Sequence, residues 1–195
     1  MRNFGFIESG KSPKDLICGA VPNVGKLPDK YLIADIAKVF DQGSHGSCVS
    51  CAAMEMLHFK EMQKGMPENK NIDFEWCYDR RADKTVEGMT PREAFDLLRH
   101  ANKIDTFARI GSLDILKQTI VAHGPALIAL PVKSYNTDFW SGSDFYGGHA
   151  VAVVGYNETG LIIKNSWGWS YGTQGQACLP YAQFDKIYEA WTIVC

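Results

Sequence analysis

A cysteine between a glycine-rich turn and an apolar run is the first feature of this sequence that could do chemistry. Cys48 follows the turn QGSHGS (residues 42–47) and opens a run with helical apolar spacing that continues to Phe59. A thiol in the first turn of a helix lies at the positive end of the helix dipole, which favours the thiolate over the thiol. Because the thiolate is the nucleophilic form, this placement predicts covalent catalysis by Cys48.

Two later segments could supply the other groups that such chemistry needs. His149 stands between two glycines and the strand-like run AVAVVGY, and Asn165 follows 16 residues later within the segment KNSWG. A cysteine nucleophile needs a base within hydrogen-bond reach and a third group that holds the base in place. We therefore expect His149 to act as the base and Asn165 to orient its ring.

In this order, the three segments resemble those of the papain-like cysteine peptidases. The resemblance implies that the Gln42 side-chain amide and the Cys48 backbone N–H form an oxyanion hole. It also implies that Asn165 accepts the N–H of His149, and that Trp167 keeps water away from that hydrogen bond.

The same resemblance predicts where substrate binds. Gly88 and Met89 precede the second expected helix, in the position of the family's glycine loop, which pairs with the substrate backbone beside an apolar pocket. Gly148, next to the base, and Trp167 complete the expected substrate-binding set.

The sequence departs from the plant and lysosomal members in ways that point to a more compact protein. His45 and Val49 stand where those members have a cysteine and an aromatic residue, so the usual disulfide cannot form. Cys48 and His149 are 101 residues apart, against roughly 130–150 in the secreted enzymes. The pattern is more similar to a prokaryotic and viral branch with shorter loops.

Composition narrows the function classes. The chain has 195 residues, 46% of them hydrophobic, and a formal net charge of −2. Without a long basic run, neither nucleic acid nor an anionic membrane is an expected partner. The expected partner is a polypeptide substrate, with a proteinaceous inhibitor left open, and the protein is expected to be a monomer. The chemistry requires no cofactor and no metal.

Cellular location and thiol state are predicted together. The N-terminus has no continuous apolar segment typical of a secretory signal, and the chain starts with Met1. We therefore expect a cytoplasmic protein of a prokaryotic cell or a virus-infected cell. Six cysteines are present, and in that compartment free thiols are the expected state.

Helices are predicted in the first half of the chain and strands in the second. One helix should begin at Cys48 and end near Gly65, and another should begin at the capping box Thr90-Pro91-Arg92-Glu93. A third should run from Ser112 to Gly124. Short β-rich runs follow at residues 126–132, 149–156, 161–165, 177–179 and 191–194. Helices first and strands second predict an α+β protein.

The resemblance implies a single papain-like domain over residues 1–195. A helical lobe would cover about residues 30–108, and an antiparallel β lobe about residues 1–29 and 109–195, with the active site in the cleft between them. Residues 1–30 are rich in proline and glycine and read as an extended arm. We expect the arm to be a permanent part of the β lobe and the enzyme to be competent as translated. The rival interpretation is a short pro-peptide that blocks the cleft.

Three alternatives to an endopeptidase remain. The same site could serve a Cys-His amidase, a peptide ligase or an isopeptidase. Cys48 and Cys51 form a CxxC pair, which raises redox or metal chemistry, but no second pair exists and the preceding turn is not a strand. Cys51 is better interpreted as a core residue. An inactive binding module is disfavoured because Gln42, Cys48, His149 and Asn165 are all present.

Overall fold

The computed structural model describes residues 3–21, 24–34, 38–66 and 73–194. Its helices are α1 (Cys48–Gln63), α2 (Phe74–Asp79), α3 (Pro91–His100) and α4 (Leu113–His123). Side-chain caps fix where the later ones begin, because the Thr90 hydroxyl accepts the N–H of Glu93 and the Ser112 hydroxyl accepts that of Ile115.

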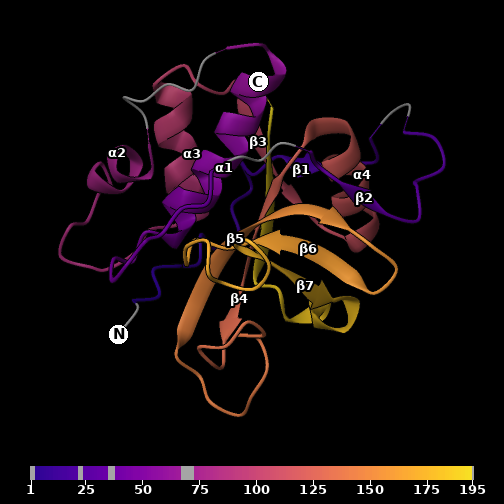
Figure 1. Cartoon of the computed structure of the whole chain (residues 1–195). Coiled ribbons are helices and arrows are strands. Elements are labelled where there is room, and N and C mark those ends of the chain that lie inside the picture. The colour runs from indigo at the N-terminus through magenta and orange to yellow at the C-terminus, as the bar shows by residue number, and fades with distance from the viewer. Residues whose placement is uncertain (1–2, 22–23, 35–37, 67–72, 195) are drawn as a thin grey trace.

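Eight strands form one sheet, with the spatial order β1-β3-β8-β4-β5-β6-β7 and with β2 paired to β5 (Figure 1). Every pairing is antiparallel except that of β1 with β3. A 3₁₀ helix (Tyr181–Lys186) precedes β8. The strands are β1 (Ile17–Cys18), β2 (Tyr31–Leu32), β3 (Thr106–Ile110), β4 (Ala126–Val132), β5 (Gly147–Tyr156), β6 (Gly160–Lys164), β7 (Gln176–Pro180) and β8 (Glu189–Val194).

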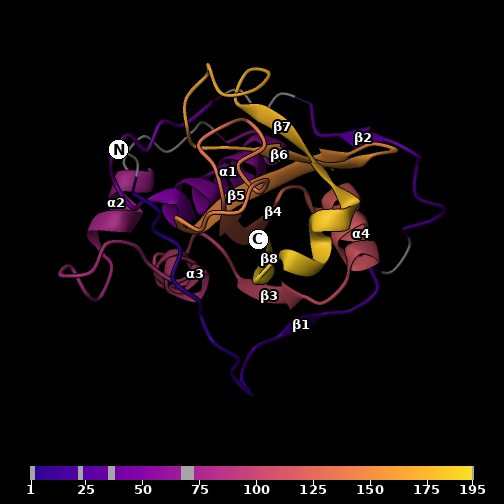
Figure 2. The same ribbon diagram turned by 90° about the horizontal axis from the view of Figure 1, so that it is seen from below.

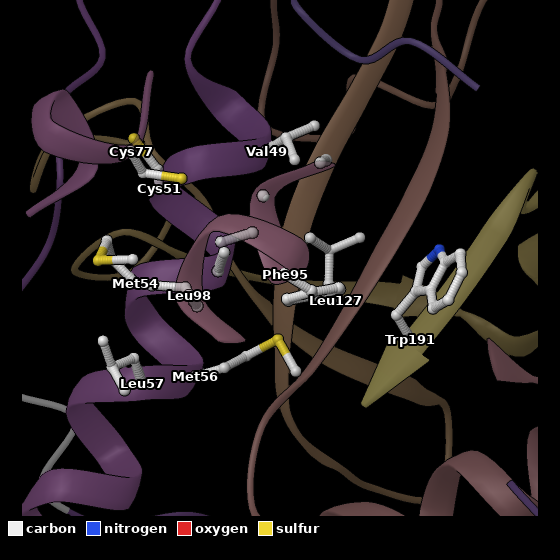
Figure 3. Packing of buried hydrophobic residues seen from close by; sticks show 14 of the residues in the cluster. Val49, Cys51, Met54, Met56, Leu57, Cys77, Phe95, Leu98, Leu127 and Trp191 are labelled. Atoms are coloured by element: carbon white, nitrogen blue, oxygen red, sulfur yellow. The ribbon is translucent and has the colours of Figure 1, made fainter. Parts of the chain in front are cut away.

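Two hydrophobic clusters lie on opposite sides of the central strands. Successive side chains of a strand point to opposite faces. Leu127 therefore joins the cluster of α1, α2 and α3, whereas Ile128 joins the cluster that contains α4. In Figure 3, Leu127 and Trp191 lie on the sheet side of this first cluster, across from residues of α1 and α3 such as Met56 and Phe95.

Helix α1 is the centre of the helical lobe. Its residues from Cys48 to His58 are all buried, so it is covered on every side rather than along one stripe. This burial fixes the position of its first residue, Cys48, relative to the sheet.

The α+β class and the two-lobe architecture are confirmed. The elements β3 and α2 were not anticipated, and β5 begins at Gly147, two residues earlier than expected. Cys18, Cys48, Cys51, Cys77 and Cys178 are free thiols, while Cys195 lies outside the described residues.

Membrane-spanning helices and metal-binding clusters are both absent from the ranges given above. No helix there is long and apolar enough to span a membrane. No group of three or more His, Cys, Asp or Glu side chains in those ranges could hold a metal ion.

The N-terminal arm does not lie on the β lobe along its whole length. Its strands β1 and β2 do pair with β3 and β5. Residues 5–7, however, bond to Met89 in the helical lobe as well as to Gly148 in the sheet. Figure 2 shows this part of the chain passing α3 before it reaches β1. These residues thus contact both lobes, and the assignment of the arm to the β lobe stays a prediction.

Candidate active site

Cys48 is the first residue of α1 and is completely buried. Burial raises the pKa of its thiol, although the backbone amides of Ala150, Gly5 and Val49 act in the opposite sense. The expected lowering of the pKa is therefore not seen in this state. The physical reason is that the arm covers the sulfur, and loss of water outweighs the helix terminus and the amides.

His149 and Asn165 meet at the ends of two adjacent strands. Strands β5 and β6 pair antiparallel, with Ala152 opposite Lys164, and this register places Asn165 beside the start of β5. His149 Nε2 lies 2.7 Å from Asn165 Oδ1, and both residues are buried. The N–H of Ser166 donates to the same oxygen at 2.8 Å.

Trp167 packs against this pair. Its ring centroid lies 5.0 Å from that of His149, at an interplanar angle of 34°. Phe139 closes another side, with its ring 5.3 Å from the imidazole and nearly perpendicular to it. The imidazole thus lies among aromatic rings that restrict its rotation and exclude water.

Gln42 is held beside the same strand end by two contacts with Ser166. The N–H of Gln42 donates to the Ser166 carbonyl at 2.9 Å, and the Ser166 hydroxyl donates to Gln42 Oε1 at 2.7 Å. The amide nitrogen of Gln42 then donates to the carbonyl oxygens of His45 and Asn3, at 2.7 and 3.2 Å. Sequence reasoning gave Ser166 no role, although it lies inside the segment around Asn165.

A buried ion pair joins the two lobes behind the site. Lys164 Nζ lies 3.0 Å from Glu55 Oε2, and both side chains are almost inaccessible to solvent. Glu55 is on the helix that begins with Cys48, and Lys164 directly precedes Asn165. This link was also missed, because a glutamate within an apolar helix has no local signal that identifies its partner.

The predicted substrate-binding residues are occupied by the chain itself. We call residues 3–10 the strap. The N–H of Met89 donates to the Gly5 carbonyl at 2.9 Å, and the Met89 carbonyl accepts the N–H of Ile7 at 3.1 Å. On the sheet side, the Gly148 carbonyl accepts the N–H of Phe6 at 3.3 Å. Gly88 leaves room for the strap backbone, because a Cβ there would lie 2.3 Å from the Gly5 carbonyl oxygen.

The structure thus gathers Gln42, His149, Asn165 and Trp167 at one strand end. Cys48 lies near them, since it belongs to the same buried cluster as Ala150, the residue after His149. Gly88, Met89 and Gly148 surround the strap that crosses this place.

Comparison with known sequences points to one family. The family model described as papain family cysteine protease matches residues 98–183. A cathepsin L-like peptidase of Aedes aegypti is 28% identical over 184 residues, which is 72% of this chain and 54% of the relative. The chain therefore spans about half the length of this relative.

Solved structures show the same fold. Xylellain, a cysteine protease from Xylella fastidiosa, superposes with a TM-score of 0.85 and 21% identity, covering 98% of this chain and 95% of that one. A procathepsin B from Trypanosoma congolense gives a TM-score of 0.76 at 13% identity, covering 99% and 85%. The family model and the relatives support a papain-like cysteine peptidase, and the solved structures show the papain-like fold.

Proposed function

We propose that the chain is a cysteine-type endopeptidase. The observation that carries this proposal is the buried contact between His149 and Asn165, next to Ala150, which packs in the same cluster as Cys48. The proposal assigns Cys48 as the nucleophile, His149 as the base and Asn165 as the orienting group, the three roles that this acyl transfer requires.

In the proposed reaction, the proton of the Cys48 thiol passes to His149 and the sulfur attacks a peptide carbonyl carbon. The Gln42 amide and the Cys48 backbone N–H stabilise the negative charge that develops on the carbonyl oxygen. His149 returns the proton to the leaving amine, which leaves an acyl group on sulfur. Water, deprotonated by His149, then attacks the thioester, and the thiol is regenerated as the acid product departs.

The proposed substrate is an extended polypeptide. The proposal is supported by the strap, whose backbone bonds to Met89 on one side and to Gly148 on the other. We propose that the same backbone groups of Met89 and Gly148 bind the substrate. Gly88 would leave room for the substrate backbone, and Trp167 would border the binding site on the side of His149. A substrate must therefore displace the strap before it binds.

A peptide-digestion assay tests the proposal. The full-length chain is incubated with an unbiased peptide mixture, with an isopeptide-linked substrate in parallel, and new termini are mapped by mass spectrometry. Internal cleavage that is lost in Cys48→Ser and kept in Cys178→Ser is expected, because Cys178 is an exposed thiol far along the chain. Isopeptide cleavage or acyl transfer without internal cleavage would favour the deconjugating or ligase alternatives instead.

A further inference from the structure

A cavity of about 480 Å³ lies outside the cleft, where the N-terminal arm crosses one edge of the sheet. Its walls come from arm residues between 11 and 17, from the end of β3 and from the segment that leads into β8. These strands are neighbours in the order β1-β3-β8 (Figure 2). None of the lining residues, all of them in the described ranges, belongs to the proposed catalytic or substrate-binding set. The volume is in the range that holds a small organic molecule.

Three charged side chains of the lining belong to a cluster in which each charge has a partner. Arg109 Nε lies 2.7 Å from Asp15 Oδ2, and Arg109 Nη1 lies 3.6 Å from Glu189 Oε2. In addition, Arg92 pairs with Asp15 at 2.8 Å, and the Trp191 indole N–H donates to Glu189 at 2.7 Å. Two carboxylates thus meet two guanidinium groups. The cluster is formally neutral, so it has no spare charge with which to select a charged ligand.

Lys11 is the remaining charged residue of the lining. It is exposed, and its side chain makes no ion pair or hydrogen bond with any residue of the described ranges. An anionic group bound in the cavity would therefore meet a positive charge that no neighbouring carboxylate neutralises. Because exposed ion pairs contribute little binding free energy, Lys11 would orient a ligand more than hold it.

Apolar side chains supply most of the remaining contact surface of the cavity. They are Ile17, Ile110, Phe184, Ile187 and Tyr188. Ile17 is 67% exposed and Tyr188 is 43% exposed. One exposed apolar side chain is ordinary, but two that border the same hollow leave a concave apolar surface in contact with water. Covering that surface with an apolar molecule would supply the main part of the binding free energy.

We propose that this cavity binds a small organic carboxylate with a compact apolar body. The body packs against Ile17 and Tyr188, and the carboxylate lies at Lys11. An organic cation is disfavoured, because both carboxylates of the lining are already paired with arginines. The inference is independent of the proposed function, since binding in this cavity needs neither the Cys48 thiol nor the His149 imidazole.

Two probes of similar shape test the class of ligand. Phenylbutyrate carries the carboxylate, and phenylbutanol replaces it with a neutral hydroxyl. Binding of each probe to the full-length protein is measured by isothermal titration calorimetry. Phenylbutyrate should bind about two- to fivefold more tightly, which corresponds to the free energy of an exposed ion pair. Equal affinities would overturn the assignment of an anionic ligand, and absence of binding by both probes up to their solubility limits would overturn the site.

Variants of the arm test which side chains contact the probe. Lys11→Gln should weaken binding of phenylbutyrate about two- to fivefold and leave phenylbutanol unchanged. Ile17→Ser should weaken both probes about five- to tenfold, because it removes apolar contact surface. The controls are Lys14→Gln and Leu16→Ser, which change exposed residues outside the lining. Both controls should bind like the wild type, and unchanged affinity in Ile17→Ser would contradict the proposed position.

NMR spectra of the backbone amides give an independent check of that position. Phenylbutyrate should shift the amides of Gly111 and Ala190, which line the cavity, and should leave those of Cys48 and His149 in place. Shifts confined to Cys48 and His149 would place the probe in the substrate cleft and would overturn the inference. Peptide hydrolysis plays no part in these measurements, so this inference and the proposed function can fail separately.

Discussion

The ring nitrogen Nε2 of His149 and the side-chain oxygen of Asn165 lie 2.7 Å apart inside the protein. The backbone N–H of Ser166 donates to the same oxygen, which identifies that atom as an acceptor. Nε2 must then carry a hydrogen, so Nδ1 is the basic nitrogen of the neutral ring. The proton exchange with Cys48 in the proposed mechanism is accordingly assigned to Nδ1.

The pH dependence of Cys48 alkylation should change when the strap is displaced. Burial raises the pKa of this thiol, so in the wild type the reactive thiolate forms only at a pH above the ordinary range. A Cβ at Gly5 would lie 1.7 Å from the carbonyl oxygen of Gly46, so Gly5→Ala should displace the strap and let water reach the sulfur. The midpoint of the rate profile should then move to lower pH. Iodoacetamide labelling from pH 5 to 10 measures it, with the exposed Cys178 as an internal reference. A midpoint that stays in place would show that the strap does not cause the raised pKa.

Gln42→Ala should lower kcat with little change in KM. In the proposed mechanism the Gln42 amide meets charge that exists only in the transition state, and loss of one such donor costs about 10²- to 10³-fold in a studied protease. Steady-state kinetics in the Gly5→Ala background measure this, with Gln63→Ala as the control because Gln63 is exposed at the end of α1. An unchanged kcat would mean that Gln42, held by Ser166, only shapes the turn.

Asp15→Asn should destabilise the protein at neutral pH and not at strongly acidic pH. Burial works to raise the pKa of Asp15, but hydrogen bonds from Arg109 and Arg92 hold it below its ordinary value. A depressed carboxyl pKa contributes stability above the unfolded-state value, which is lost as pH falls through the folded-state value.

The measurement for Asp15 is the melting temperature against pH. The wild type should exceed Asp15→Asn by about 3–10 °C at pH 7, and the difference should be lost as the pH falls through the lowered folded-state pKa of Asp15. The exposed Asp185 provides the control variant, Asp185→Asn. A difference that persists unchanged into acid would show that the charge of Asp15, paired with Arg92 and Arg109, is not what stabilises the protein.

Breaking the buried pair of Glu55 and Lys164 should cost far more than removing both partners. Glu55→Leu leaves a buried cation and should lower the free energy of unfolding by about 3–5 kcal/mol. Adding Lys164→Met should recover much of that loss, because two apolar side chains of similar volume then meet. Urea unfolding of the four proteins of the cycle gives the coupling energy, and simple additivity would argue against a direct interaction.

Local sequence signals predicted the helices whose first turns are capped by a side chain only three residues away. The Thr90 hydroxyl caps an amide three residues later, and Ser112 does the same, so both helices could be predicted. Strand β3 was not anticipated, because its Arg109 looks unsuited to a packed sheet. Its charge is compensated by Asp15, 94 residues earlier in the chain.

The sequence predicted which residues form the candidate site, but it did not predict that the Cys48 thiol is buried. The order of the three segments led to Cys48, His149 and Asn165. The condition of the Cys48 thiol depends on Gly5, which meets it only because Gly46 and Gly88 leave space for the strap. Three glycines separated by about 40 residues each show no pattern that sequence periodicity could reveal.

The strap also determines what any kinetic constant of the intact chain would report. Because it is part of the same molecule, it is present at a constant effective concentration that dilution cannot reduce. Substrate binds only the open fraction, so the apparent dissociation constant is the intrinsic one divided by that fraction. A strap that is open for about 1% of the time would weaken apparent affinity about 100-fold without altering a single contact in the cleft.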